Sequence, residues 1–177
     1  TQRRLLTAYV RRWEMSPIAV GSALKALAWI KEGNEPDFIL IDACLGEDKT
    51  TRWHLPWHKM KGLTFLRDLA ALGLAPEDID YVMCTHLHGD HIGWNTRLLD
   101  GRWVPTFPKA RYVMSRAEVD YYRNFNKTAS AEDYEECIDE SVLPVVEAGQ
   151  AVLIGGDFAL DDEVWIDPMP GHTLGHY

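Results

Sequence analysis

The sequence has few cysteines, no long apolar run and a shortage of basic side chains. Its three cysteines lie far apart, so they form neither a disulfide framework nor a Cys-x-x-Cys knuckle, and a reduced cytoplasm is the expected location. Cys84 is interpreted as a buried core thiol. No apolar stretch approaches the ~18 residues that span a membrane. The net charge of −9 excludes a nucleic-acid partner, because nucleic-acid phosphates require a basic face.

The composition that is present suits one soluble globular domain. A chain of 177 residues with 46% hydrophobic and 25% charged residues can bury a sizeable core. No internal repeat, low-complexity tract or linker divides the sequence. We therefore expect residues 1–177 to form a single domain.

The string Thr85-His-Leu-His-Gly-Asp-His91 carries four metal-competent side chains, His86, His88, Asp90 and His91. It follows an apolar run at 79–84 that predicts a strand. Side chains at i and i+2 of an extended chain point the same way, so the first two histidines face one spot. Gly89 then lets the backbone turn, which brings the last two side chains back toward that spot. Imidazoles with one carboxylate suit a borderline divalent ion such as zinc.

Helix and strand patterns alternate along the rest of the chain. Strands are expected at about 23–30, 38–41, 110–114, 142–146, 150–154 and 163–166, and helices at about 63–72, 115–125 and 130–141. The first two strands are predicted to form a hairpin, with 38–41 buried, and residues 94–108 to form a loop. Ser115 and Glu118 form a capping-box pattern. This alternation is typical of the α/β or layered α+β classes.

A second string, Pro170-Gly-His-Thr-Leu-Gly-His176, follows the last expected strand. A catalytic zinc commonly has three protein ligands and an open position for water. His86 and His88 supply two of these ligands, and His172, in a glycine-bounded turn, can supply the third. His176 is not expected to be a ligand.

The two histidine strings, preceded by Ile39-Leu-Ile-Asp42, resemble those of the metallo-β-lactamase-fold hydrolase superfamily in their order and spacing. The resemblance covers nearly the whole chain and implies a four-layer αββα sandwich with metal ions at one edge between two sheets. It implies a first ion bound by His86, His88 and His172, and a second bound by Asp90 and His91. Asp42 is then the buried carboxylate beside the site.

Segments 93–96 and 101–108 are similar to those of a branch that contains acyl-homoserine-lactone lactonases and organophosphate hydrolases. The resemblance implies metal-dependent hydrolysis of a lactone, ester or related small substrate, with phosphotriester or β-lactam hydrolysis as the alternatives. Two divalent ions, expected to be zinc with Mn²⁺, Fe²⁺ or Co²⁺ as other candidates, would share the attacking hydroxide, and Asp90 would shuttle its proton. Candidates for the pocket wall, with core packing as the equal alternative, are Trp94, Trp103 and Phe107.

The superfamily pattern continues past the third histidine with a bridging aspartate and a final histidine, which would lie beyond Tyr177. We therefore expect this sequence to be a piece of a longer protein that lacks the C-terminal portion of the domain, has an incomplete second metal site and shows little activity alone. The alternative from another class is a non-catalytic metal-binding or scaffold protein. The expected partner is a small-molecule substrate, with no membrane partner, and a homo-oligomer is compatible with the sequence.

Overall fold

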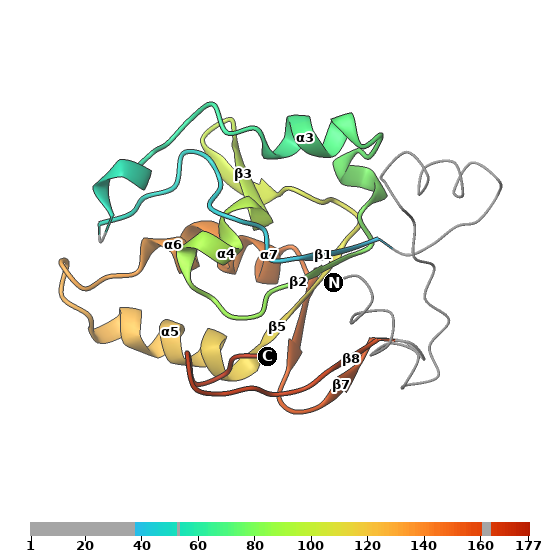
Figure 1. The fold of residues 1–177 in the computed structure, drawn as a ribbon. Helices are drawn as coiled ribbons and strands as arrows, with labels where there is room; N and C mark the ends of the chain where they lie inside the picture. Colours follow the sequence, from blue (N-terminus) through green and yellow to red (C-terminus); the bar gives the residue numbers. More distant parts are fainter. Residues whose placement is uncertain (1–37, 53, 161–163) are drawn as a thin grey trace, which may run out of the picture. The chain divides into compact units, whose positions relative to one another are not determined.

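The computed structural model describes residues 38–177, except residue 53 and residues 161–163. Contacts between Cα atoms divide the chain into two units, residues 1–36 with 159–165 and residues 37–158 with 166–177. The second unit contains the main sheet, its helices and both histidine strings (Figure 1). The expected strand at 23–30, and with it the expected hairpin, lies outside the described residues.

The helices of the described part are short. They are α3 (Phe65–Ala71), α4 (Gly89–Ile92), α5 (Arg116–Thr128), α6 (Glu136–Ser141) and α7 (Leu143–Glu147), with 3-10 turns η1 (Leu55–Trp57), η2 (Pro76–Asp78) and η3 (Gly93–Asn95). Helix α3 confirms the helix expected at 63–72, and α5 confirms the helix that begins after Ser115. None of the helices in the described ranges is long and apolar enough to cross a membrane.

Four short strands form a parallel sheet in the order β1-β2-β5-β6. They are β1 (Ile39–Ile41), β2 (Tyr81–Met83), β5 (Arg111–Ser115) and β6 (Ala151–Ile154). Because the strands are parallel, their carboxyl ends meet at one edge of the sheet, where open α/β sheets place their ligands. Asp42 follows β1 at this edge, the string 85–91 follows β2, and α5 follows β5. The mixed α/β class is therefore confirmed.

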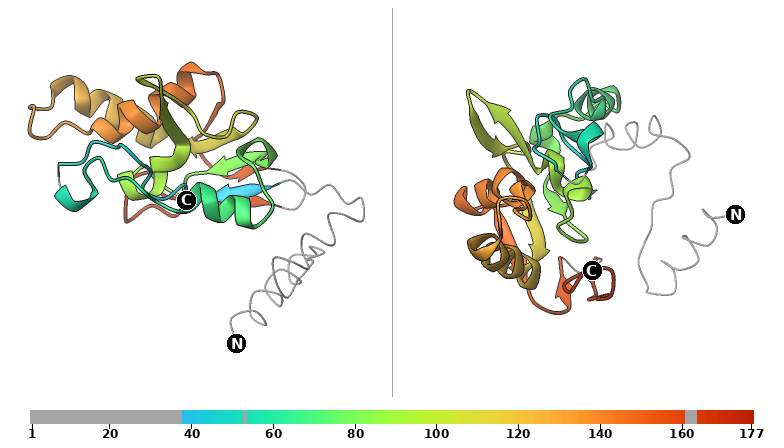
Figure 2. Two further views of the ribbon diagram at one scale, coloured as in Figure 1. Left: turned by 90° about the horizontal axis from the view of Figure 1, so that it is seen from above. Right: turned by 90° about the vertical axis from the view of Figure 1, so that its left-hand side faces the viewer.

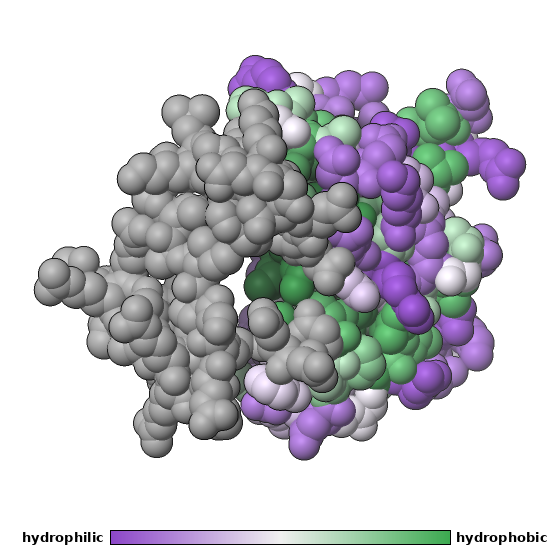
Figure 3. All heavy atoms as spheres, turned by 90° about the vertical axis from the view of Figure 1, so that its right-hand side faces the viewer, coloured by the Kyte–Doolittle hydropathy of each residue, from purple (hydrophilic) through white to green (hydrophobic). Residues whose placement is uncertain are grey.

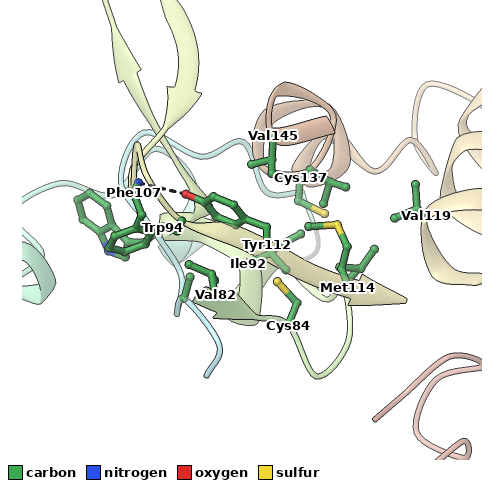
Figure 4. Close-up of a cluster of buried hydrophobic side chains, with 14 of the residues drawn as sticks. Val82, Cys84, Ile92, Trp94, Phe107, Tyr112, Met114, Val119, Cys137 and Val145 are labelled. Atoms are coloured by element: carbon green, nitrogen blue, oxygen red, sulfur yellow. Dashed lines mark hydrogen bonds between the residues drawn. The ribbon is translucent and has the colours of Figure 1, made fainter. Parts of the chain in front are cut away.

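Helices α5, α6 and α7 lie on one side of the sheet (Figure 2). The register aligns Leu40 with Val82 and Val82 with Tyr112, so these side chains share the face that packs on the helices. Figure 4 shows this core, in which the Phe107 backbone N–H donates to the Tyr112 hydroxyl at 3.1 Å. Burial of these apolar side chains is the main stabilisation of the sheet and its helices.

Strand β1 is less buried than the sequence predicts. Ile39 and Leu40 are half-buried, and Ile41 is 61% exposed. Strand β1 is an edge strand of the described sheet, and Ile41 points to the face opposite Leu40, away from the helices. Apolar side chains also remain accessible among hydrophilic ones on the face drawn in Figure 3.

Residues 94–108 are not a loop, contrary to the prediction. Strands β3 (Thr96–Leu99) and β4 (Arg102–Pro105) pair in an antiparallel hairpin. Asp100 and Gly101 connect them with φ of 50° and 76°, the left-handed backbone that a two-residue hairpin turn requires. The prediction interpreted Gly101 and Pro105 as loop punctuation, although Asp-Gly between short apolar runs is itself a hairpin signal.

Two further element predictions were wrong in type or extent. Residues 142–146 do not form a strand, because the run Leu143–Glu147 is α7, with Pro144 in the first turn where its missing N–H costs nothing. Helix α6 begins at Glu136 rather than Ser130. Strand β6 confirms the strand expected at 150–154, and a two-stranded sheet pairs β7 (Phe158–Ala159) with β8 (Trp165–Ile166).

Candidate metal centre

Three histidine side chains from two distant segments meet at the carboxyl edge of the sheet. One ring nitrogen from each of His86, His88 and His172 lies within 4.8 Å of the other two. The Nε2 atom of His86 is 3.0 Å from Nδ1 of His88. Two nitrogens bound to one tetrahedral zinc ion at ~2.0–2.1 Å would lie about 3.3 Å apart. The cluster therefore has the donor atoms and the size that fit a zinc ion.

The segment that carries His172 is held against the first string by backbone hydrogen bonds. The Tyr177 N–H donates to the Thr85 carbonyl at 3.0 Å. Within the segment, the Met169 N–H donates to the His176 carbonyl at 2.7 Å. These backbone bonds hold the segment 169–177 against Thr85, at the start of the first histidine string. The position of His172 is therefore set by the backbone and not only by its own side chain.

Asp42 determines how two of the histidine rings present their nitrogens. Its carboxylate accepts from the Thr85 N–H and the Thr85 hydroxyl, each at 2.8 Å, and lies 2.9 Å from His91 Nδ1. The Thr85 hydroxyl in turn lies 3.0 Å from His86 Nδ1. A ring that donates from Nδ1 has Nε2 free to bind a metal. The structure therefore places Asp42 where it can orient His91 directly and His86 through Thr85.

Asp90 and His91 form a second pair of donors next to the three histidines. Both lie on α4, and His91 Nε2 is 3.7 Å from Asp90 Oδ2. The rings of His86 and His91 have centroids only 4.1 Å apart. All five predicted ligand side chains are thus brought to one place.

A cavity of about 390 Å³ opens beside these donors. It is lined by Leu87, His88, Gly89, Asp90, His91, Tyr122, Glu135, Cys137 and His172. Among the described residues, this lining contains carboxylates but neither lysine nor arginine. A negatively charged ligand would therefore meet no cationic side chain there.

Burial favours the neutral form of two histidines of the cluster, His86 and His88. It lowers the pKa of His86 to about 4, and the neighbouring His91 and His88 rings add to this effect. Burial also lowers the pKa of His88, with His172 as the next contributor. Neutral imidazole is the form that binds a metal, so at pH 7 protons do not compete with the ion at these two side chains.

These pKa values predict that the metal-free protein loses stability in mild acid. Between pH 6.5 and about 4 the unfolded chain binds a proton at His86 that the folded chain does not, so the free energy of unfolding falls as the pH drops. One such histidine contributes at most about 1.4 kcal/mol per pH unit, and less where solvent screens it. Denaturant titrations from pH 7.5 to 4.5 measure this slope. His86→Gln should reduce it, and an unchanged slope in that variant would contradict the assignment.

The arrangement of parallel sheet, histidine strings and orienting aspartate can be compared with known families. The sequence profile of the metallo-beta-lactamase superfamily matches residues 29–177. The chain belongs to this superfamily. It is similar to an N-acyl homoserine lactonase from Bacillus sp, with 32% identity over 108 residues, which is 61% of this chain and 35% of that protein. A Bacillus cereus protein of the same name is 30% identical over the same shares. The match thus spans about a third of the length of these lactonases.

Two solved structures have a fold similar to that of this chain. A probable metal-dependent hydrolase from Staphylococcus aureus superimposes with a TM-score of 0.60 at 25% identity, covering 78% of this chain and 47% of that chain. The dizinc quorum-quenching lactonase AidC gives a TM-score of 0.55 at 19% identity, covering 88% of this chain and 58% of that chain. The latter likeness concerns the fold alone.

The three aromatic residues expected in the pocket wall do not line the cavity beside the histidine cluster. Trp94 is 5% exposed and Phe107 fully buried, both in the hydrophobic core, so these two have the core-packing role that was the alternative (Figure 4). Trp103 lies under the Lys49 ammonium, 3.5 Å from its ring centroid. None of the three lines the cavity beside the histidines. Cys84 is 1% exposed, as expected of a core thiol.

Several residues at the site were not predicted from the sequence. Tyr122, Glu135 and Cys137 line the cavity from α5 and the start of α6. Glu118, interpreted from the sequence only as part of a helix cap, hydrogen-bonds both histidine segments. No local signal identifies the first three, because they reach the cavity through the packing of distant elements.

Proposed function

We propose that this chain is the metal-binding part of a metal-dependent hydrolase that opens small, uncharged lactones or esters. The observation that carries the proposal is the meeting of His86, His88 and His172, next to Asp90 and His91, beside a ligand-sized cavity. The chain's membership of the metallo-beta-lactamase superfamily and its similarity to lactonases support hydrolysis as the reaction.

The donor atoms suit two divalent ions, with zinc as the expected metal. His86, His88 and His172 would hold the first ion, and Asp90 with His91 would contribute to the second. Ions bound there supply Lewis acidity toward a carbonyl oxygen and lower the pKa of water toward about 7. Asp42 keeps the His91 ring in the orientation that frees its Nε2.

Asp90 is the proposed acid–base group. Its side chain is 41% exposed and lines the cavity, so it can reach both solvent and a bound substrate. A carboxylate in this position can take the proton of the attacking water and return it to the leaving oxygen. Such a step gives the opened product of a lactone, an alcohol and a carboxylate.

The side chains of the cavity wall favour neutral substrates over β-lactam antibiotics. Asp90 and Glu135 place two carboxyl groups in its wall, and the described lining residues include no lysine or arginine. Penicillin-like β-lactams carry a carboxylate, and the described wall offers it no lysine or arginine as a side-chain partner. Lactones and phosphotriesters have no such charge.

The full-length natural protein, loaded with Zn²⁺ or Mn²⁺, should hydrolyse an N-acyl homoserine lactone with kcat/KM of about 10⁴ M⁻¹s⁻¹ or more. A penicillin should react at least about 100-fold more slowly, because its carboxylate finds no lysine or arginine in the described cavity wall. A phosphotriester included in the same panel tests the alternative neutral substrate. A lactone that carries a carboxylate should be hydrolysed faster by Glu135→Gln than by the wild type. The rate with the uncharged lactone should be the same for both proteins. Metal binding without turnover of any of these substrates would instead support the non-catalytic alternative.

A further inference from the structure

Glu118 is a buried carboxylate at the start of α5. Only 1% of its surface is exposed, and it is the third residue of the helix. The Ser115 hydroxyl, at the N-cap, accepts a hydrogen bond from the Glu118 N–H at 3.4 Å. In a complete capping box the glutamate would reach back to the N-cap N–H. Its carboxylate is used differently here.

The carboxylate of Glu118 accepts hydrogen bonds from both metal-ligand segments. One oxygen accepts from the Leu87 N–H at 2.7 Å, and the other accepts from the Gly175 N–H at 3.2 Å. Leu87 lies between His86 and His88 in the chain, and Gly175 follows His172 by one short turn. One side chain therefore connects the segment that supplies two histidines with the segment that supplies the third.

Gly175 shows how closely the second segment approaches the helix. A Cβ atom on this residue would lie 2.2 Å from the Ser115 hydroxyl oxygen and 2.8 Å from Cγ of Glu118. Only a glycine permits that approach. The contact is therefore a close fit between the loop and the first turn of α5, in addition to the hydrogen bond.

The burial of Glu118 has an energetic cost that its contacts must offset. None of the ion pairs found among the described residues involves this side chain, so two backbone N–H groups are its visible compensation. A buried carboxylate without a cation is expensive compared with an apolar side chain of similar size. An apolar side chain could fill the same space but could not hold two loops in register.

From this geometry we infer that Glu118 is a positioning residue that assembles the first metal site before the ion binds. The inference rests on the proposed function, in which His86, His88 and His172 hold the ion. By bonding the backbone on both sides, Glu118 fixes the spacing of the three rings and reduces the ordering that the ion must impose. Groups that hold ligands in place in this way typically contribute about 10–100-fold in metal affinity.

The test is the Zn²⁺ affinity of the 177-residue chain, measured by competition with a chromophoric chelator. Glu118→Gln retains the size of the side chain but only one carbonyl acceptor, and should bind Zn²⁺ about 10–100-fold more weakly. Asp120→Asn is the matched control, because Asp120 carries the same charge on the exposed side of the same helix and should bind as the wild type does. Val145→Ala, in the core, controls for lost stability alone.

Two further measurements keep the outcome decisive. In the metal-free protein, hydrogen exchange of residues 168–177 should increase in Glu118→Gln and not in Asp120→Asn. If Glu118→Gln does not fold, Gly175→Ala displaces the same contact from the loop side and should weaken Zn²⁺ binding with every histidine present. Affinity in Glu118→Gln equal to that of Asp120→Asn, or no weaker than that of Val145→Ala, overturns the inference and leaves the metal site standing. Absence of Zn²⁺ binding in the wild type overturns the proposed function itself.

Discussion

His88→Ala should abolish tight Zn²⁺ binding and reduce lactone hydrolysis by more than about 100-fold. His88 supplies one of three ring nitrogens that lie within 4.8 Å of one another. The Nδ1 atom of His88 is 3.0 Å from the Nε2 atom of His86. Without it, two imidazoles remain for an ion that normally takes three or four protein ligands. Chelator competition measures the affinity of the chain, and steady-state kinetics of the full-length natural protein measures the activity.

His176→Ala is the matched control for this prediction. The ring of His176 lies near the cluster, 5.0 Å between centroids from His86, yet it is not one of the three donors that converge. Its replacement should change Zn²⁺ affinity by no more than a few fold. A loss as large as that of His88→Ala would make His176 a ligand and contradict the assignment.

The sequence predicts elements well where local pattern and tertiary packing agree. The apolar spacing at 63–72 and the Ser115 cap are local signals, and α3 and α5 form there. The run at 142–146 could not be assigned from local pattern, because four apolar residues suit a buried strand and a buried helix equally. In the folded protein, tertiary packing selects the helix α7. Strand β1 is more exposed than expected because it lies at the edge of the sheet that the described residues form, and no short sequence pattern contains this topology.

The candidate site divides in the same way. The metal donors could be predicted because His86 and His88 lie two residues apart after a strand, and their chemistry is visible in the residue types themselves. The cavity wall could not be predicted, because Tyr122 and Glu135 line the cavity only when α5 and α6 pack on the sheet. The role of Glu118 was hidden for a different reason: its local motif already offered a sufficient explanation as a helix cap.

Gly93→Ala should be among the most destabilising single substitutions in the chain, costing more than about 3 kcal/mol. A Cβ at this position would lie 1.7 Å from the carbonyl oxygen of Leu45 and 1.9 Å from its carbonyl carbon. The neighbour is backbone, so no side-chain rotation relieves the clash. Denaturant unfolding of the metal-free protein measures the loss. Gly155→Ala is the control, since its Cβ would have nothing within 4 Å.

The damage in Gly93→Ala should extend to the metal centre, because this contact fastens the segment after β1 to α4. The Gly93 N–H donates to the Cys44 carbonyl at 2.7 Å, and the Ala43 N–H donates to the His91 carbonyl at 2.6 Å. If these two backbone segments moved apart, Asp42 would also move away from the His91 ring that it orients. If Gly93→Ala folds, its metal affinity at Asp90 and His91 should therefore fall more than its metal affinity at His86 and His88. Stability within 1 kcal/mol of the wild type would show that the close backbone contact does not exist in solution.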